Sequence, residues 1–351
     1  MQSPSPAPSD DVLTTPAPAV SDAEAAAILH RHFGLQGEVT ALTSERDRNF
    51  RLRLADGRAF VLKLAHPAEP AAVTNLQTAA LLHLAARDPG LPVPAVVPGL
   101  DGAPERRLGF GDGRTMVTRL ITYLEGEPLH RALASPAQAR ALGLVLGRLD
   151  RALADFSHPA MERSLLWDAT KVTAMRGLLE HLPDKAARAF IAGIMDRFEA
   201  VAMPRLGALR RQLTHNDLNP HNVVVDPADH ARIAGIIDFG DALAAPLVAD
   251  LGTALAYQVA AEGDPLSRVR AFAAGFQAEC PLDEAEIAVL PHLIMARMVL
   301  TICITHWRAG LEPGNRDYIL RNNPGAWHGL RALAAFPPEA LAADLGRAMK
   351  G

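Results

Sequence analysis

The sequence has very few cysteines: Cys280 and Cys303 are the only two among 351 residues. Two cysteines are too few for a disulfide framework, and we find no set of partners for them at metal-ligand spacing. Such scarcity is typical of proteins in a reducing compartment, so we expect a cytoplasmic protein.

Basic charge and uninterrupted apolar runs are also lacking. The chain has 35 Lys and Arg against 39 Asp and Glu, a net charge of −4, so we expect no binding of nucleic acid. The longest apolar run, 287–304, contains Pro291, His292 and Arg297. These interruptions favour a buried helix over a membrane span, and we expect no membrane association.

The first twenty residues, MQSPSPAPSDDVLTTPAPAV, have neither the basic nor the apolar segment of a signal peptide, and their composition predicts a disordered tail over 1–20. The whole chain is 49 % hydrophobic, enough for a substantial core in two lobes or domains. We predict a smaller lobe at 21–124 and a mostly helical lobe at 125–351.

The segment FRLRLADGRAFVLKL, 50–64, alternates apolar and polar residues around an Asp-Gly pair, which predicts a β-hairpin. With a two-residue turn, Lys63 lies opposite Phe50 and Val61 opposite Leu52, all on one face. A lysine buried among apolar side chains is costly unless it meets an anion. The alternative is a lysine at the rim of the sheet, with its ammonium group in water.

Further elements follow from periodicity. A helix is expected over 75–87, a strand over 115–123, and a helix that begins at Ser135-Pro136 with leucines at steps of three and four residues. Two short apolar strands, 222–225 and 233–237, interrupt the helical remainder. The class expected from this pattern is α+β.

The stretch LTHNDLNPHNVVVD, 213–226, concentrates polar side chains ahead of one of these strands. His215, Asp217 and His221 could ligate zinc, but their spacing is not that of a helical pair and no cysteine lies nearby. A polar loop that only satisfies its own backbone is the other simple interpretation.

A catalytic loop is a third interpretation. His215, Asp217 and Asn222 have the H-x-D-x-x-x-x-N spacing of a phosphotransferase, and Asp238 follows in an Asp-Phe-Gly sequence. Phosphoryl transfer needs a carboxylate that orients the attacking hydroxyl, here Asp217, and oxygen ligands for Mg²⁺, here Asn222 and Asp238. Lys63, in Val-Leu-Lys, then meets the phosphates of ATP or GTP. On the same predicted sheet face, Leu52 and Val61 would cover the purine.

With these motifs, the segments SERDRNF, FVLKLAH, RLITYLEG and GIIDFGDALAAPLVADLGTALAY make the chain resemble a known family. It is similar to the aminoglycoside phosphotransferase-like, or choline kinase-like, small-molecule kinases over nearly everything after residue 20. Within the family it looks most like hydroxylysine kinases and, equally, the phosphotransferase domains fused to class-III aminotransferases. The resemblance implies a bilobal protein-kinase-like fold, a small β-sheet lobe and a larger helical lobe.

The resemblance also implies roles for other residues. It places a nucleotide loop at 44–49 instead of a glycine-rich loop, a hinge for the purine at 121–123, and a bracing aspartate for the catalytic loop at Asp250. The candidate nucleotide-binding residues in these segments are Ser44, Arg46, Asn49, Ile121 and Tyr123.

The sequence departs from the family in two places. Gln77 occupies the place of the glutamate that pairs with the lysine in many relatives, so Gln77 or Glu69 could take that part. Asn216, Asn219 and His221 replace Gly, His and Gly of the commoner loop, and Asn219 and His221 could be turn residues only.

The segment 292–331, expected to line the acceptor site, carries five arginines (Arg297, Arg308, Arg316, Arg321, Arg331) and two acids (Glu312, Asp317). A polycationic aminoglycoside would favour the reverse balance. A hydroxylated amino acid needs an arginine for its carboxylate and an acid for its ammonium, for which Asp241 is the best candidate. The other candidates, which could equally be core or solvated side chains, are Trp167, Asp168, Arg297, Trp307, Arg308 and Tyr318.

We therefore expect a Mg²⁺-dependent small-molecule kinase that uses ATP or GTP and phosphorylates a hydroxyl of an amine-containing metabolite, a hydroxylysine-like amino alcohol first. An aminoglycoside phosphotransferase, or another choline- or homoserine-type kinase, is the alternative with the same chemistry. A nucleotide-binding pseudokinase is the alternative of another class. The sequence leaves ATP against GTP and the oligomeric state open.

Overall fold

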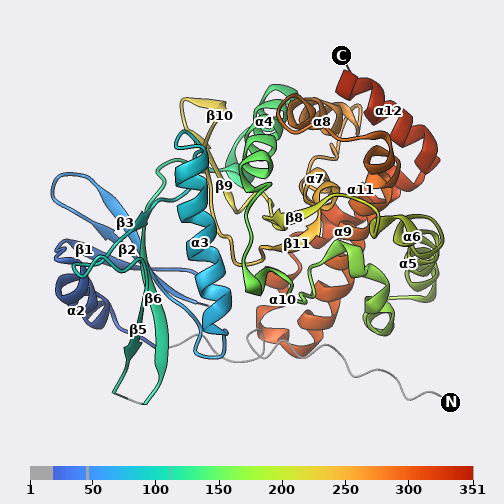
Figure 1. Cartoon of the computed structure of the whole chain (residues 1–351). Coiled ribbons are helices and arrows are strands. Elements are labelled where there is room, and N and C mark those ends of the chain that lie inside the picture. Colours follow the sequence, from blue (N-terminus) through green and yellow to red (C-terminus); the bar gives the residue numbers. More distant parts are fainter. Residues whose placement is uncertain (1–18, 45–46, 112, 351) are drawn as a thin grey trace.

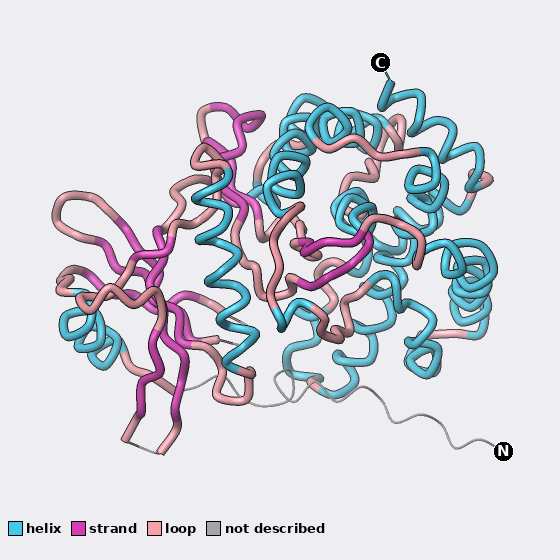
Figure 2. The backbone as a smooth tube through the Cα atoms, in the orientation of Figure 1, coloured by secondary structure: helices cyan, strands magenta, loops and turns pink. Residues whose placement is uncertain are grey.

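The computed structural model describes residues 19–44, 47–111 and 113–350, which form two lobes (Figure 1). Strands dominate the smaller lobe and helices the larger one (Figure 2), in agreement with the expected α+β kinase-like fold. The predicted tail lies almost wholly outside the described residues, and the candidate Arg46 lies outside them too.

An antiparallel sheet forms the smaller lobe, with the strand order β1-β2-β3-β6-β4 and with β5 beside β6. Its strands are β1 (Glu38–Leu42), β2 (Arg48–Arg53), β3 (Ala59–Leu64), β4 (Val96–Val97), β5 (Arg106–Gly109) and β6 (Thr115–Thr122). The chain then enters the larger lobe, where β7 (Glu127–Pro128) pairs with β9 (Val223–Asp226).

The predicted hairpin of β2 and β3 forms with a longer turn than expected. The amide of Leu54 donates to the carbonyl oxygen of Arg58 at 2.9 Å, which encloses three turn residues instead of two. Gly57 in this turn has φ of +88°, a left-handed conformation that glycine adopts without steric cost.

The extra turn residue changes which side chains share a face. Lys63 lies opposite Asn49, and Val61 lies opposite Arg51. Because a shift of one residue exchanges the two faces of a strand, Leu52 points away from Lys63 and is fully buried. The prediction that Leu52 covers the purine was therefore wrong.

Helices α2 and α3 cover opposite faces of the sheet. α2 (Asp22–Phe33) begins with the predicted capping box, in which Ser21 and Glu24 exchange hydrogen bonds. It packs on the face that carries Leu52. α3 (Ala71–Arg87) begins four residues before the predicted start and joins the core of the larger lobe. It therefore stands between the sheet and the larger lobe (Figure 1).

Helices make up most of the larger lobe, beginning with α4 (Pro136–Leu153), which starts after the predicted Ser135 cap. The other helices are α5 (Lys185–Arg197), α6 (Met203–Leu206), α7 (Leu247–Leu255), α8 (Ser267–Glu279), α9 (Glu284–Leu311), α10 (Arg316–Ile319), α11 (Asn323–Ala334) and α12 (Pro338–Lys350). Shorter helical segments are η1 (Leu129–Arg131), η2 (Pro159–Met161), η3 (Ala169–His181), η4 (Phe198–Ala202) and η5 (Pro313–Asn315).

The longest of these helices, α9, lies inside the lobe. By length and composition it could cross a membrane, with a mean hydropathy of 2.1, but 89 % of the apolar window is buried within the fold. A core helix of a soluble protein has the same composition, and the burial agrees with the buried helix predicted for 287–304.

Glycines let α4 and α8 pack closely. A Cβ atom on Gly143 of α4 would meet the carbonyl oxygen of Phe272, and one on Gly275 of α8 would meet that of Arg140. The leucine stripe of α4 is visible in the sequence, but this close approach is set by the small residues between the leucines.

Two small sheets hold the predicted catalytic segments. β8 (Arg211–Thr214) pairs with β11 (Leu243–Pro246), and β9 pairs with β10 (Asp229–Ile236). The loop after β8 and the loop after β10 meet where the amide of Ile237 donates to the carbonyl oxygen of Asn222 at 2.9 Å. Residues that are some twenty positions apart are thereby brought into one site.

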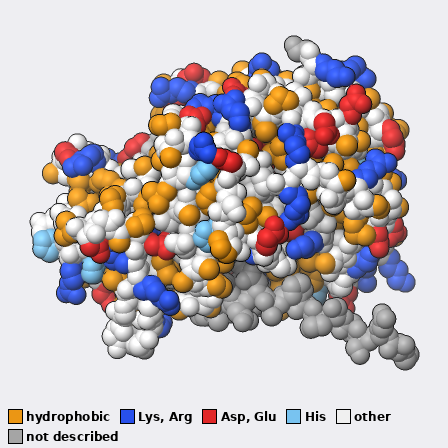
Figure 3. Space-filling view, in the orientation of Figure 1, with side chains coloured by type: hydrophobic (Ala, Val, Ile, Leu, Met, Phe, Trp, Pro, Cys, Tyr) orange, Lys and Arg blue, Asp and Glu red, His pale blue; other side chains and the backbone are white. Residues whose placement is uncertain are grey.

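The surface agrees with the small net charge. On the face in Figure 3, basic and acidic side chains are interspersed and do not gather by sign. Both cysteines are free and buried.

Candidate active site

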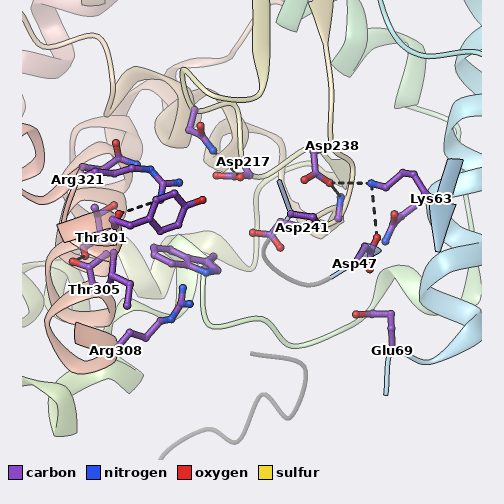
Figure 4. A pocket seen from close by; sticks show the side chains of 18 of the residues that line it. Asp47, Lys63, Glu69, Asp217, Asp238, Asp241, Thr301, Thr305, Arg308 and Arg321 are labelled. Atoms are coloured by element: carbon purple, nitrogen blue, oxygen red, sulfur yellow. Dashed lines mark hydrogen bonds and ion pairs between the residues drawn. The ribbon is translucent and has the colours of Figure 1, made fainter. Parts of the chain in front are cut away.

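A cavity lies between the two lobes and takes its walls from both. Among the described residues, five basic side chains (Lys63, Arg119, Arg297, Arg308, Arg321) and five acidic ones (Asp47, Glu69, Asp217, Asp238, Asp241) line it. Figure 4 shows Lys63 and Glu69 at one end and Arg308 and Arg321 at the other, with Asp217, Asp238 and Asp241 between. The cavity can thus hold both anionic and cationic groups.

The loop after β8 is held from below by Asp250 of α7. Its carboxylate accepts the amides of His215 at 2.7 Å and of Asn216 at 2.8 Å, in agreement with the bracing part that the family resemblance implies. Asn216 occupies the family's glycine place with φ of +62°, a conformation that Asn tolerates better than most residues.

His215 holds this loop to the next one. Its Nδ1 accepts the amide of Asp217 at 3.3 Å, and its Nε2 lies 3.2 Å from the carbonyl oxygen of Ile237. An acceptor Nδ1 requires the proton on Nε2, so the ring is neutral and both nitrogens are used. The zinc alternative also lacks a site: the described residues contain no group of three or more potential His, Cys, Asp or Glu ligands.

The carboxylate of Asp217 is held by three side chains. Oδ2 accepts the amide groups of Asn219 at 2.8 Å and Asn222 at 2.7 Å, and Oδ1 accepts Arg297 at 2.6 Å. Burial raises the pKa of Asp217 to about 6; Arg297 opposes this shift and the charge of Asp241 adds to it. Asn219 is therefore more than a turn residue.

Asn222 and Asp238 offer oxygen atoms to a divalent cation. Among the described residues, the Asn222 side chain makes its hydrogen bonds through its amide nitrogen, which donates to the carbonyl oxygen of Asp217 at 3.0 Å and to the Asp217 carboxylate at 2.7 Å. The amide oxygen can therefore face a metal ion. Asp238 has φ of +64°, an uncommon conformation that a short side chain tolerates. Its carboxylate accepts the amide of Gly240 at 3.0 Å. These donors suit the hard cation Mg²⁺.

Lys63 lies between Asp238 and Asp47, which is part of the predicted nucleotide loop. Its Nζ lies 3.9 Å from Asp47 and 3.8 Å from Asp238, and these two ion pairs are drawn in Figure 4. Asp47 also accepts the amide of His66 at 3.1 Å, which fixes the loop to the segment that follows β3. The lysine therefore finds its anions on the loop and on Asp238, not on α3.

Gln77, in the usual place of glutamate, binds a different cation. Its side-chain oxygen accepts a hydrogen bond from the buried Arg119, which lies directly across from Lys63 in the sheet. Arg119 also donates to the carbonyl oxygen of Thr74 at 3.0 Å. Burial lowers the pKa of Arg119, and nearby carboxylates, Asp47 first, oppose that shift. An arginine, rather than the lysine, thus ties α3 to the sheet.

Comparison with known proteins agrees with this geometry. Residues 38–288 match the APH phosphotransferase enzyme family, which is more than half of the chain. The chain belongs to this family. It is a small-molecule kinase that acts on a hydroxyl group.

Curated relatives of this kinase include hydroxylysine kinases. The one from Danio rerio is 28 % identical over 316 residues, with 86 % of this chain and 88 % of the relative covered. The one from Mus musculus is 25 % identical over 339 residues, with 90 % of each chain covered.

Solved structures show the same fold. Amicoumacin kinase hAmiN, in complex with AMP-PNP, Ca²⁺ and Ami, has a TM-score of 0.65 at 18 % identity and covers 90 % of this chain and 95 % of its own. A microcompartment-associated aminopropanol kinase has a TM-score of 0.60 at 18 % identity and covers 93 % and 99 %.

Several predicted site residues of the kinase line the cavity, and others do not. Those in the lining are Ser44, Lys63, Gln77, Trp167, Asp217, Asp238, Asp241, Arg297, Arg308 and Tyr318. Asp168 instead caps η3 by accepting the amide of Thr170 at 2.9 Å, and Trp307 packs against the core. Placing these two at the acceptor was wrong, because their side chains satisfy local structure.

The candidate purine residues lie outside this lining. Val61 and Ile121 face each other across β3 and β6 and join the larger core. The guanidinium of Arg51 stacks on Tyr123, with its central carbon 4.5 Å from the centre of the Tyr123 ring. Asn49 lies opposite Lys63 with its side-chain oxygen buried.

Sequence reasoning did not select Asp47, Arg119 or Tyr257, and it counted Arg321 only among the arginines of the acceptor segment; all four line the cavity. Asp47 could have been found, since it lies within SERDRNF beside the chosen Ser44 and Asn49. Arg119 lies on the apolar strand β6, Tyr257 in the turn after α7 and Arg321 in the turn after α10. In none of these places does the neighbouring sequence indicate the partner of the side chain.

Proposed function

We propose that this kinase transfers the γ-phosphoryl group of ATP or GTP to a hydroxyl of an amine-containing metabolite. The observation that carries the proposal is the convergence of Asp217 and Asp238 of the larger lobe with Lys63 of the smaller lobe on one cavity. Asn222 lies outside the lining but donates to the Asp217 carboxylate at 2.7 Å. These are the groups that phosphoryl transfer needs.

Asp217 orients the acceptor. Oδ2 already accepts two hydrogen bonds, whereas Oδ1 accepts one, from Arg297. A carboxylate oxygen has two lone pairs, so the remaining one on Oδ1 is the natural place for the acceptor hydroxyl to donate.

Lys63 binds the nucleotide phosphates, since its Nζ lies 3.8 Å from Asp238, the proposed metal ligand. Asn222 and Asp238 would hold Mg²⁺, which would neutralise charge on the phosphates. Ser44 and Asn49 would contact the nucleotide from the loop, and Val61 and the backbone at 121–123 would lie at the purine.

The acceptor end of the cavity suits a hydroxylated amino acid. Arg308 and Arg321 would bind its carboxylate, and Asp241 its ammonium group. Tyr318 stacks on Arg321, with the guanidinium 3.9 Å from the ring centre, and keeps that cation at the cavity. The hydroxylysine kinases among the relatives support hydroxylysine as the first acceptor to test.

A coupled assay with ATP and with GTP tests this proposal on two matched acceptors. Hydroxylysine and its decarboxylated analogue share the hydroxyl and both amines and differ only in the carboxylate. Losing a charge-assisted hydrogen bond costs about 1.5–3 kcal/mol, so we expect kcat/KM to be roughly 10- to 150-fold lower for the analogue.

Two variants assign the carboxylate. Arg308→Met should reduce the difference in kcat/KM between hydroxylysine and its decarboxylated analogue. Arg331 is an exposed arginine stacked on Trp327, and Arg331→Met should leave the ratio of the two kcat/KM values unchanged. If the analogue or kanamycin is phosphorylated faster than hydroxylysine, the carboxylate acceptor is rejected in favour of an amino alcohol or an aminoglycoside.

A further inference from the structure

Arg297 projects from the middle of α9 to the carboxylate of Asp217. Its side chain is only 3 % exposed, and its Nη2 lies 2.6 Å from Oδ1 of Asp217. Such a short, buried ion pair holds two charged groups in one relative position, because leaving either charge unpaired in the interior is costly.

All five N–H groups of this guanidinium are accounted for. Nε donates to the hydroxyl of Tyr257 at 3.2 Å, and Nη2 donates to the same hydroxyl at 3.0 Å and to Asp217. Nη1 donates to the carbonyl oxygens of Trp167 at 3.3 Å and Asn216 at 3.5 Å. Arg297 therefore has no N–H left for the carboxylate of an acceptor.

Two aromatic rings enclose the same guanidinium. Its central carbon lies 5.0 Å from the ring centre of Trp167 and 5.8 Å from that of Tyr257. Cation–π attraction and the two hydrogen bonds to Tyr257 hold the plane of the guanidinium in place. The segment before η3, the turn after α7 and the loop after β8 thus all contact this one side chain. Arg297 therefore fixes Asp217 relative to the helices of the larger lobe.

We propose that Arg297 is a positioning residue that fixes Oδ1 of Asp217 toward the acceptor hydroxyl, and that it does not bind the acceptor. This rests on the proposed role of Asp217. In the transfer step the acceptor oxygen bonds to the γ-phosphorus and the bond from that phosphorus to the β,γ-bridging oxygen breaks. The nucleoside diphosphate leaves with the electron pair, and the hydroxyl proton passes to Oδ1.

The proposal departs from the expectation that Arg297 is a substrate ligand, and it leaves Arg308 and Arg321 as the cations for the acceptor carboxylate. Binding the acceptor and positioning Asp217 have different effects on the kinetic constants. A ligand of the acceptor affects KM, whereas a group that only aims Asp217 affects kcat, because misplacement of the reacting groups slows the chemical step.

Arg297→Lys keeps the positive charge but loses the five-donor fork. With hydroxylysine as the probe, we expect kcat to fall roughly 10- to 100-fold and the acceptor KM to stay within about twofold. Arg308 lies on the same helix, and Arg308→Met should instead change the acceptor KM more than kcat. An Arg297→Lys enzyme whose acceptor KM rises tenfold with little loss of kcat overturns the proposal.

The melting temperature of Arg297→Lys will show whether this variant folds. If it does not fold, Tyr257→Phe provides a second test of the proposal. It removes the hydroxyl that accepts two of the five bonds and leaves the ion pair in place. We expect kcat to fall about 2- to 10-fold with unchanged acceptor KM. A change confined to KM would again contradict positioning.

Nucleotide hydrolysis without any acceptor keeps the test independent of hydroxylysine, because water then takes the place of the hydroxyl at Asp217. Slower hydrolysis by Arg297→Lys supports positioning, even if hydroxylysine proves not to be the acceptor; wild-type hydrolysis rejects it. In an Asp217→Asn background, Arg297→Lys should change this rate by less than about twofold, since no carboxylate remains to aim. A further tenfold loss there would show that Arg297 acts apart from Asp217.

Discussion

Burial and ion pairing act in opposite directions on the carboxyl group of Asp217. Burial raises its pKa to about 6 although Arg297 lies 2.6 Å away and favours the charged form. The side chain is thus ionised at neutral pH but remains a better proton acceptor than an exposed aspartate. This combination suits a residue that must orient a hydroxyl and accept its proton late in the reaction.

The pH dependence of activity should report this carboxyl group. Only the ionised form can accept the hydroxyl proton, so kcat/KM for the acceptor should be constant above pH about 6 and fall about tenfold per unit below it. A steady-state pH profile at saturating nucleotide measures this. Asp217→Asn should be roughly 10²- to 10⁴-fold slower, and its residual activity should lack the acidic fall. A wild-type profile flat down to pH 4.5 would exclude Asp217 as the titrating group.

Helices α4 and α7 meet beneath the catalytic loop through two carboxyl groups. Asp150 of α4 is fully buried, and its neighbour Asp250 of α7 holds the loop amides. Neither side-chain oxygen of Asp150 accepts a hydrogen bond from a described residue. Asp250 is its neighbouring carboxyl group, and two carboxyl groups can share a hydrogen bond only when one of them is protonated. Burial, and then Asp250, raise the pKa of Asp150 well above its usual value, which places the proton there.

Asp150→Asn should therefore be tolerated, because an amide N–H can replace the carboxyl O–H. A raised folded-state pKa means that the native protein binds more protons than the unfolded chain above pH 3.8, so this group makes stability fall as pH rises. The amide does not titrate. Relative to wild type, Asp150→Asn should gain stability from pH 5 to pH 8 in denaturant unfolding.

Asp150→Leu is the contrasting variant, since it fills similar space without a donor. It should lose about 1.5–3 kcal/mol and most activity, as a buried carboxylate then loses a partner. Equal losses in both variants and no pH trend would mean that Asp150 is ionised in the folded protein.

A charged contact joins the two lobes of the molecule at the cavity. Lys63 reaches from the smaller lobe to Asp238 of the larger one at 3.8 Å, while Asp238 remains 54 % exposed. An ion pair so accessible to water contributes little by itself. Nucleotide phosphates, bound between the lobes, would supply a stronger link.

Nucleotide with Mg²⁺ should consequently stabilise the wild-type protein, by about 2.7 kcal/mol at a concentration of 100 Kd. Lys63→Met should leave the melting temperature without nucleotide nearly unchanged and remove most of the shift that nucleotide causes at the same concentration. Lys185→Met, an exposed lysine at the start of α5, is the control and should behave as wild type. A full nucleotide shift in Lys63→Met would exclude the lysine from phosphate binding.

Local patterns in the sequence determined much of the molecule. Capping residues, apolar periodicity and the spacing of Asp217, Asn222 and Asp238 depend on neighbours within a few positions or one short hairpin, so they could be predicted without coordinates. The α+β class and the buried course of α9 followed from the same patterns.

Only the tertiary structure decided the register of β2 and β3 and the partners of the charged side chains. One additional turn residue moved Leu52 to the opposite face. Arg297 meets Asp217 across 80 positions, and Arg119 meets Gln77 across 42. Such pairs form because burying a charge without a partner is costly, and which partner is in reach depends on how the helices and the sheet pack, not on spacing along the chain.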